Sequence, residues 1–209
     1  MHADIKPLSD RALSIATKNA GEARRLAEHL RSEGDWQDVV AGLRSVAVFY
    51  DPLSQTAAAV AEALLKAAES MPPYRAAAQI AHIDIPVRYG GEDGPDLLLL
   101  CERNGLSPEE FIEKHTAPLY EVALMGFLPG FAYLSGLDPA LAAPRLDEPR
   151  MRVRAGSVGI GGNEAGIYSL DGSGGWPIIG RTEKKLFDRG SDEPFLLSPG
   201  ATIHFHRAP

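Results

Sequence analysis

Glycine is distributed very unevenly along this chain of 209 residues. Of the 21 glycines, 18 lie after residue 85, and the preceding part carries only Gly21, Gly34 and Gly42. Glycine adopts backbone conformations that other residues avoid, so a glycine-rich part is typical of tight turns and sheet corners. We therefore expect two domains, an N-terminal α/β domain over 1–84 and a β-rich domain over 85–209.

The hydrophobic pattern of the first domain predicts alternating strands and helices. Residues 11–17 alternate as a strand does, and apolar residues recur at helical spacing over 21–31. The later predicted elements are two strands, a helix that ends before a Pro-Pro pair, and a last strand, at 36–40, 43–50, 57–68 and 78–85. The order βαββαβ predicts a ferredoxin-like domain.

The second domain opens with turn residues and helices and continues as short strands. Ser107, Pro108 and Glu110 supply the N-cap, the first-turn proline and the capping-box glutamate of a helix that runs to about His115. Beyond it, β-branched and aromatic runs alternate with Gly/Pro clusters, at 120–125, 151–153, 157–160, 166–170, 177–179 and 202–206. Such spacing predicts an all-β sandwich or barrel, so the fold class is α+β.

Charge and hydropathy exclude two classes of protein. The net charge is −7 and the pI about 5.4, so we expect no nucleic-acid partner. No apolar run approaches the ~18 residues of a membrane helix, so we expect no membrane partner. The first residues lack a basic stretch followed by an apolar one, and the single Cys101 suits a reducing compartment, which together predict a cytoplasmic protein.

The densest group of aromatic residues lies directly after a predicted strand. Its aromatic, proline and glycine members are Phe127, Pro129, Gly130, Phe131 and Tyr133. A loop of this kind is typical of a ligand cleft, where rigid rings flank exposed backbone groups. It is equally typical of a barrel corner whose phenylalanines fill the core, and both interpretations stay open.

A glycine-rich run follows over 155–162. Glycines permit positive φ and let backbone amides approach an anion closely. The bends of a small barrel need the same glycines, and this run alone favours that structural interpretation. Its candidate cleft residues are Gly156, Ser157, Gly161 and Gly162.

Residues 175–182 match the glycine and threonine spacing of a phosphate-binding P-loop, with arginine in place of lysine. A true P-loop opens a helix, whereas Pro177 and the β-branched pair after it place a strand inside the supposed loop, so we reject that interpretation. Arg181 and Thr182 are still candidates to face a cleft, because arginine offers a bidentate fork to a carboxylate or phosphate. The alternative for Arg181 is a salt bridge at the rim.

Arginines alternate along one predicted strand. Arg150, Arg152 and Arg154 would project from the same face, where their mutual repulsion favours solvent or an anionic partner. A solvated face spaced by Asp147 and Glu148 is the simpler interpretation. The alternative is contact with an acidic subunit or substrate.

Three histidines are candidates for chemistry. His115, at a predicted helix end beside a loop, is a candidate general base, although a histidine there also caps the final carbonyl groups. His204 and His206 share one strand face but have no nearby third ligand in the sequence, so we expect no metal site.

Taken together, these stretches resemble one family, the allophanate hydrolase subunit 1 family, nearly from end to end. The motifs that carry the resemblance are at 9–13, 85–92, 126–134, 155–158, 166–168 and 174–182. The family includes the B subunit of bacterial ATP-dependent 5-oxoprolinase and the Kip inhibitor of a sporulation histidine kinase. The resemblance implies that the second domain is a cyclophilin-like β-barrel.

The resemblance also implies that the chain is one subunit of an ATP-dependent amidohydrolase. Family members look like one half of a pair whose other half is of the allophanate hydrolase subunit 2 type. With a third, lactam-binding subunit, such an assembly opens the cyclic amide 5-oxoproline to glutamate at the expense of ATP. No metal is predicted from this chain.

A cleft between the two paired barrels is part of what the resemblance implies. Its expected lining on this side is Phe127, Pro129, Gly130, Phe131, Tyr133, Gly156, Ser157, Gly161, Gly162, Tyr168, Trp176 and Thr182. Arg181 is the expected catalytic residue, with His115 as a second candidate. Backbone amides of the glycine run and Arg181 would hold negative charge as it develops.

The chain departs from the family pattern at Glu164 and Ala165, where a Gln-Thr pair is usual, and at Ser169, where a proline is usual. A different substrate within the family is one possible meaning of these changes. The competing functions are a Kip-type inhibitor that binds the helical domain of a histidine kinase and a subunit related to allophanate hydrolase or urea amidolyase. A prolyl isomerase rests on barrel analogy alone.

Overall fold

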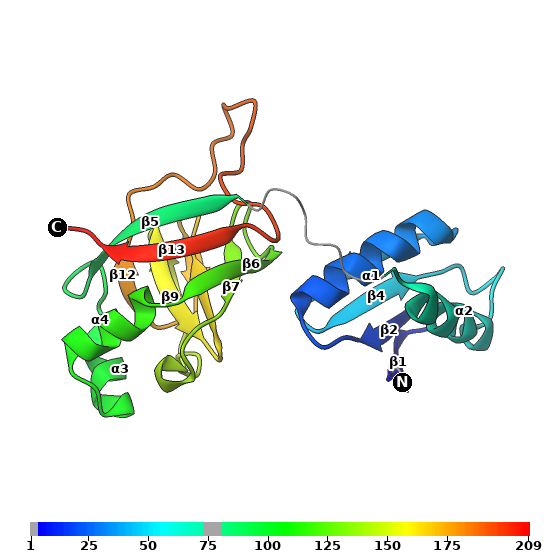
Figure 1. Cartoon of the computed structure of the whole chain (residues 1–209), viewed down its shortest axis with the longest axis horizontal. Coiled ribbons are helices and arrows are strands. Elements are labelled where there is room, and N and C mark those ends of the chain that lie inside the picture. The colour runs from blue at the N-terminus through cyan, green and yellow to red at the C-terminus, as the bar shows by residue number, and fades with distance from the viewer. Residues whose placement is uncertain (1–3, 73–80) are drawn as a thin grey trace. The chain divides into compact units, whose positions relative to one another are not determined.

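The computed structural model describes residues 4–72 and 81–209. The chain divides into two compact units, residues 1–77 and 78–209 (Figure 1). The fold class is α+β, as predicted, with an open sheet and two helices in the first unit and a closed barrel in the second. None of the helices within these described ranges is long and apolar enough to cross a membrane.

The first unit is an antiparallel sheet packed against two helices. Its strands are β1 (Ile5–Ser9), β2 (Ala12–Ala16), β3 (Asp38–Ala41) and β4 (Ser45–Phe49), in the order β1-β2-β4-β3. Its helices are α1 (Ala20–Glu33) and α2 (Ala57–Ser70). The side chains of Asn19 and Thr56 accept hydrogen bonds from amides of the first turns, which fixes where the two helices begin.

The strand order is that of a ferredoxin-like sheet, but the fourth strand comes from a different place in the chain. β1, which the sequence pattern did not indicate, pairs with β2 where a strand after α2 was expected. Of the strand expected over 78–85, residues 78–80 lie outside the described residues, and residues 82–85 form the first part of β5 (His82–Tyr89), which belongs to the barrel. Its side chains Ile85 and Val87 are completely buried there, so the expected boundary between 84 and 85 falls inside β5.

The second unit is a closed barrel in the strand order β10-β7-β6-β13-β5-β12-β9. Besides β5, its strands are β6 (Leu119–Met125), β7 (Ala132–Ser135), β9 (Ser157–Gly161), β10 (Glu164–Ile167), β12 (Ile178–Arg181) and β13 (Thr202–Arg207). β5 and β13 run parallel, whereas the other neighbouring pairs are antiparallel. Closure leaves the barrel strands without open edges.

Two helices and a small sheet surround the barrel. α3 (Leu97–Asn104) and α4 (Pro108–Thr116) follow β5, and β8 (Arg150–Val153) pairs with β11 (Gly172–Gly174). A 3-10 turn spans Pro139–Leu141. The predicted capping box of α4 is confirmed, because Ser107 Oγ accepts from the Glu110 amide and the Glu110 carboxylate accepts from the Ser107 amide.

Glycines on the outer face of the barrel make room for an indole ring. Trp176 lies over β9 and β10 in an apolar cluster that is separate from the barrel interior. A Cβ on Gly166 would lie 2.7 Å from the Trp176 ring, and a Cβ on Gly161 would overlap the same ring. These glycines are therefore required by packing at this face.

We predict that Gly161→Ala lowers the free energy of unfolding by about 1–3 kcal/mol, because the added methyl group displaces Trp176 from the barrel wall. Urea unfolding followed by tryptophan fluorescence measures the change. Gly126→Ala is the matched control, since a Cβ at Gly126 meets nothing within 4 Å. Equal stability of the two variants would contradict the packing argument.

Candidate functional site

One rim of the barrel collects the segments that the sequence singled out. Ile167 at the end of β10 lies opposite Ala132 of β7 and Val158 of β9, and Arg181 at the end of β12 lies opposite Ser157. The connections that leave these strand ends therefore lie next to one another. They are the segments 126–131, 154–156, 168–171 and 182–187.

The aromatic loop after β6 is held in a fixed shape. The Phe131 amide donates to the Leu128 carbonyl at 3.0 Å, and Ser169 Oγ donates to the Pro129 carbonyl at 2.6 Å. A Cβ on Gly130, which has a φ of 80°, would come within 2.9 Å of Phe187 Cβ. Ser169, one of the departures from the family pattern, thus fastens the loop to the strand end beside it.

The two phenylalanines of the aromatic loop differ in exposure. Phe131 is buried and meets Tyr133, Tyr168 and Trp176 edge to face, with ring centroids 4.9–5.8 Å apart. Phe127 instead has a φ of 74° and is 60% exposed, although its edge still meets Phe131 at 5.5 Å. Positive φ is unusual for a bulky residue, so the loop presents this ring to solvent at a cost in backbone strain.

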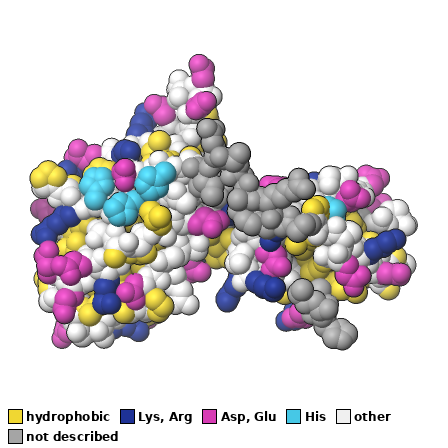
Figure 2. Space-filling view, in the orientation of Figure 1, with side chains coloured by type: hydrophobic (Ala, Val, Ile, Leu, Met, Phe, Trp, Pro, Cys, Tyr) yellow, Lys and Arg dark blue, Asp and Glu magenta, His cyan; other side chains and the backbone are white. Residues whose placement is uncertain are grey.

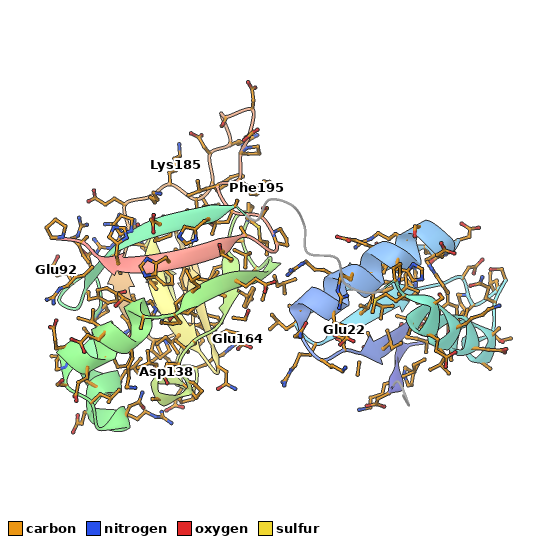
Figure 3. All side chains as sticks on the ribbon, in the orientation of Figure 1. Glu22, Glu92, Asp138, Glu164, Lys185 and Phe195 are labelled. Atoms are coloured by element: carbon orange, nitrogen blue, oxygen red, sulfur yellow. The ribbon has the colours of Figure 1, made fainter. Side chains whose placement is uncertain are left out.

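A groove of about 550 Å³ runs beside the exposed ring. Its lining is the loop 125–130 on one side and Phe195, Leu197, Ser198 and Pro199 on the other. The second side belongs to the long connection between β12 and β13, on which Figure 3 labels Lys185 and Phe195. The sequence-based prediction did not include this side. The signal available in the sequence was an aromatic residue, Phe195, in a connection that contains prolines.

Arg181 lies on the same rim with its guanidinium anchored. Its Nε donates to the Ala155 carbonyl at 2.9 Å, and the Ala155 amide donates to Asp171 at 2.8 Å. The Arg181 side chain is 27% exposed. Thr182 beside it is buried, and its hydroxyl accepts from the Lys184 amide, so Thr182 stabilises the turn.

The structure assigns the backbone amides of the glycine run to internal bonds. The Gly156 amide donates to the Tyr168 carbonyl and the Gly162 amide to the Ala143 carbonyl, both at 2.7 Å, and the Ser157 amide donates to the Arg154 carbonyl at 3.1 Å. Gly161 lies in β9 under Trp176. These three amides are already bonded within the chain, so they do not form the anion cradle that we expected.

The three alternating arginines, Arg150, Arg152 and Arg154, each pair with a different carboxylate. Arg150 is half-buried and donates to Asp96 at 2.7 Å, and the exposed Arg152 donates to Asp171 at 2.7 Å. Arg154 lies beyond the end of β8 and donates to Asp93 at 3.0 Å. The three guanidinium groups are therefore paired within the chain and do not form one free cationic face.

The segment 175–182 contains a strand, which agrees with rejection of a P-loop. β12 covers Ile178–Arg181, and β9 and β5 flank it. The Ile178 amide donates to the buried Asp96 carboxylate at 2.6 Å. This bond ties the start of β12 to the residue that precedes α3.

His115 of α4 is completely buried against side chains of β5, β6 and β13. Its Nδ1 lies 2.8 Å from the Tyr89 hydroxyl, and its ring packs on Phe205 at 4.7 Å. Burial lowers the pKa of His115 to about 3 and raises the pKa of Tyr89 far above its ordinary value. A base that no solvent or substrate reaches is a core residue, so the geometry does not support the role of general base.

The buried imidazole predicts a loss of stability in mild acid. The folded chain keeps His115 neutral, whereas the unfolded chain protonates it below a pKa of about 6.5, so stability falls as pH falls from about 6.5 toward 3. Between pH 7 and pH 5 this amounts to about 2 kcal/mol. Urea unfolding at both pH values should show a smaller difference for His115→Met, and an unchanged difference would contradict the assignment.

Histidines gather on the outer face of β5 and β13 (Figure 2). Asp84 Oδ1 lies 3.5 Å from His204 Nδ1 and 3.8 Å from His82 Nε2. The sequence pattern pairs His204 with His206 and does not show the neighbours that β5 supplies. Across 4–72 and 81–209, no group of three histidine, cysteine or acidic side chains is arranged to hold a metal ion.

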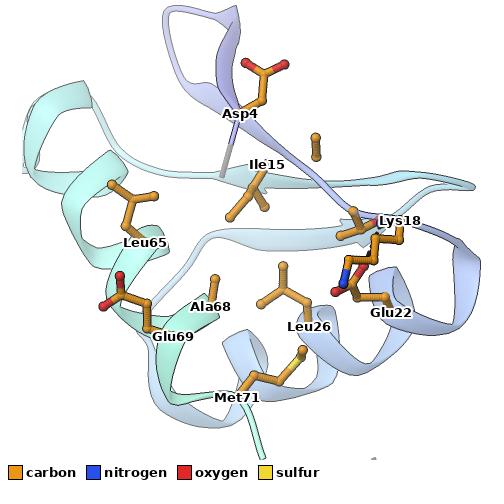
Figure 4. Close-up of a pocket in the computed structure, with 11 residues that line it drawn as sticks. Asp4, Ile15, Lys18, Glu22, Leu26, Leu65, Ala68, Glu69 and Met71 are labelled. Carbon is orange, nitrogen blue, oxygen red and sulfur yellow. Dashed lines mark hydrogen bonds between the residues drawn. The ribbon is translucent and has the colours of Figure 1, made fainter. Parts of the chain in front are cut away.

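The first unit has a hollow of its own, of about 460 Å³ (Figure 4). Leu26 of α1 and Leu65 and Met71 of α2 and its end line it, with the carboxylates of Glu22 and Glu69 at the edge. Its lining contains none of the candidate residues.

The comparisons with known proteins agree on one family. The model of the carboxyltransferase domain, subdomain C and D, matches residues 3–197. A 5-oxoprolinase B subunit from Haemophilus influenzae is 42% identical over 185 residues, which are 86% of this chain and 83% of that protein. One from Escherichia coli O157:H7 is 50% identical over 123 residues, which are 59% of this chain and only 56% of that protein.

A solved structure shares the fold across nearly the whole chain. The crystal structure of the K. lactis urea amidolyase superposes with a TM-score of 0.80 at 18% identity. The match covers 99% of this chain and 15% of the amidolyase. At this identity the likeness concerns the fold alone.

Proposed function

Because the chain belongs to the carboxyltransferase subdomain C and D family, we propose that it acts as the B subunit of an ATP-dependent 5-oxoprolinase. The observation that carries the proposal is the 42% identity to a 5-oxoprolinase B subunit across 86% of this chain. In the proposal, a subunit 2 type protein and a lactam-binding third subunit complete the enzyme. ATP is a co-substrate of that assembly.

The chemistry explains why several subunits and ATP are needed. An unstrained lactam is a poor electrophile, and phosphoryl transfer from ATP to its oxygen converts that oxygen into a leaving group. Water then adds to the activated carbon, and the ring C–N bond breaks as the nitrogen leaves as the amine, which gives an acyl phosphate. A second water hydrolyses the acyl phosphate to glutamate and phosphate. Negative charge moves through several oxygen atoms in this sequence, so fixed cationic donors lower the barrier.

The complete set of subunits should release glutamate from 5-oxoproline only with ATP, and omission of this chain should abolish the release. Coupled assay of glutamate, with each component left out in turn, measures this. Release without this chain would overturn the proposal. An assembled but inactive set would also count against it and would direct attention to another amide substrate.

Arg181 is the residue of this chain best placed to hold developing charge. Its guanidinium is fixed by the bond to the Ala155 carbonyl and reaches solvent at the rim. We predict that Arg181→Met lowers glutamate release at least about a hundredfold, because a charge-assisted donor is lost, while assembly persists. Replacement of the exposed Arg103 on α3 by Met is the control, and full activity of the Arg181 variant would contradict this role.

The groove beside the aromatic loop is a candidate contact for the subunit 2 type partner. Phe127 is 60% exposed and Phe195 48% exposed, and both line the same groove. Large apolar side chains gathered around a hollow are typical of protein contacts. The groove supports a protein partner independently of any catalytic role.

We predict that Phe127→Asn combined with Phe195→Ser weakens association with the partner at least about tenfold, because two aromatic anchors are removed. Asparagine tolerates positive φ, so the loop should keep its shape. Analytical ultracentrifugation or titration calorimetry measures the affinity. Leu53→Ser in the first unit, at a position 96% exposed and outside the groove, is the control, and equal affinities for all three proteins would exclude the groove as the contact.

A further inference from the structure

One carboxylate at the barrel rim is shared by three guanidinium groups. Asp93 lies in the turn after β5. Its Oδ2 accepts from Arg88 Nε at 2.9 Å, and its Oδ1 accepts from an Arg154 terminal nitrogen at 3.0 Å. A terminal nitrogen of Arg181 lies 3.8 Å from the same Oδ1, an ion pair but not a hydrogen bond.

Arginines outnumber acidic side chains in the ion pairs of this group. Glu183 supplies a second carboxylate, 2.7 Å from Arg88, but it makes no ion pair with Arg154 or Arg181 among the contacts within the described ranges. Asp171 also interacts electrostatically with Arg181 but is itself paired with Arg152, and Arg154 donates to the Glu92 carbonyl as well. A cluster of guanidinium groups attracts an anion from solution.

The arginines at the rim also have hydrogen-bond donors to spare. A guanidinium carries five N–H donors. Arg181 uses Nε on the Ala155 carbonyl, and its terminal nitrogens make no hydrogen bond within the described part of the chain. The Arg154 side chain is 47% exposed and that of Arg181 27% exposed, whereas Asp93 is 20% exposed, so solvent reaches the two arginines more readily than the carboxylate.

We propose that Arg154 and Arg181, backed by Arg88, form a binding site for an oxygen anion, a phosphate or a carboxylate. Asp93 pairs with all three side chains and competes with an incoming anion for their donors. The anchored Nε fixes the Arg181 fork, so two parallel N–H···O bonds can form without reorientation. The proposal deepens the proposed function and rests on it only for which anion arrives, the lactam carboxylate or the transferred phosphate.

Titration of the full chain alone with inorganic phosphate, and separately with 5-oxoproline, tests the site. NMR shifts at constant low ionic strength should show saturable binding of at least one probe, and the probe that binds identifies the source of the anion. Arg181→Met and Arg154→Gln should each weaken that binding at least about tenfold, the loss expected for charge-assisted hydrogen bonds. Arg103→Gln, which removes the same charge on α3, should change it less than twofold, and absence of binding to the unmodified chain would overturn the proposal.

Asp93→Asn should change the affinity for the anion in the opposite direction to the arginine substitutions. Removal of the competing charge should raise the affinity for the bound probe by about threefold or more, provided that urea unfolding shows a folded variant. If the folded variant binds no better than the unmodified chain, Asp93 does not compete with the anion and the site is excluded as described. Because these titrations need no partner subunit, binding by the chain with an inactive assembly would sink the proposed function and leave the site standing.

Discussion

β5 and β13 pair in parallel from His82 with Thr202 to Val87 with Arg207, and this pairing closes the barrel. The two strands lie at opposite ends of the second unit's sequence, so the chain between them must return to its starting point. β12 then lies on the other side of β5, with Arg181 opposite Arg88. The turn after β5 runs past the start of β12, where the Gly90 amide donates to the Ile179 carbonyl, and its Asp93 carboxylate lies 2.9 Å from Arg88 and 3.8 Å from Arg181.

Packing on the outer face of the barrel requires glycine at several positions, because a side chain there would overlap a neighbouring ring. Gly161 and Gly166 leave space for Trp176, and Trp176 supports Phe131 at 5.8 Å between ring centroids. Phe131 is buried in this cluster, whereas Phe127 is exposed at positive φ and lines the groove. One loop thus contributes one ring to the packing and another to the groove.

The ion pairs of the rim differ in what they contribute. Arg152 and Asp171 are both well exposed, and such pairs add little to stability. Asp96 is buried and satisfied by Arg150 and by the Ile178 amide, so it fixes the start of α3 against β12. Asp93 is intermediate, because it is mostly covered but shared by three guanidinium groups, which together offer more donors than one carboxylate can satisfy. In a structural salt bridge the donors and acceptors satisfy each other, whereas here the arginines keep N–H donors with which a further anion can bond.

Local sequence by itself determined the elements whose signals are complete within a few residues. The capping box of α4, the strand within 175–182 that excludes a P-loop, and the α+β class all follow from short-range propensity and periodicity. Tertiary structure decided which sheet β5 joins, because the alternation at 82–89 fits either sheet and only pairing with a strand more than a hundred residues away selects one. It also decided that His115 is core, that the Gly156 and Gly162 amides are already bonded, and that Arg154 and Arg181 share Asp93. Each of these depends on which distant segment supplies the neighbour, and a residue's own sequence context does not contain that information.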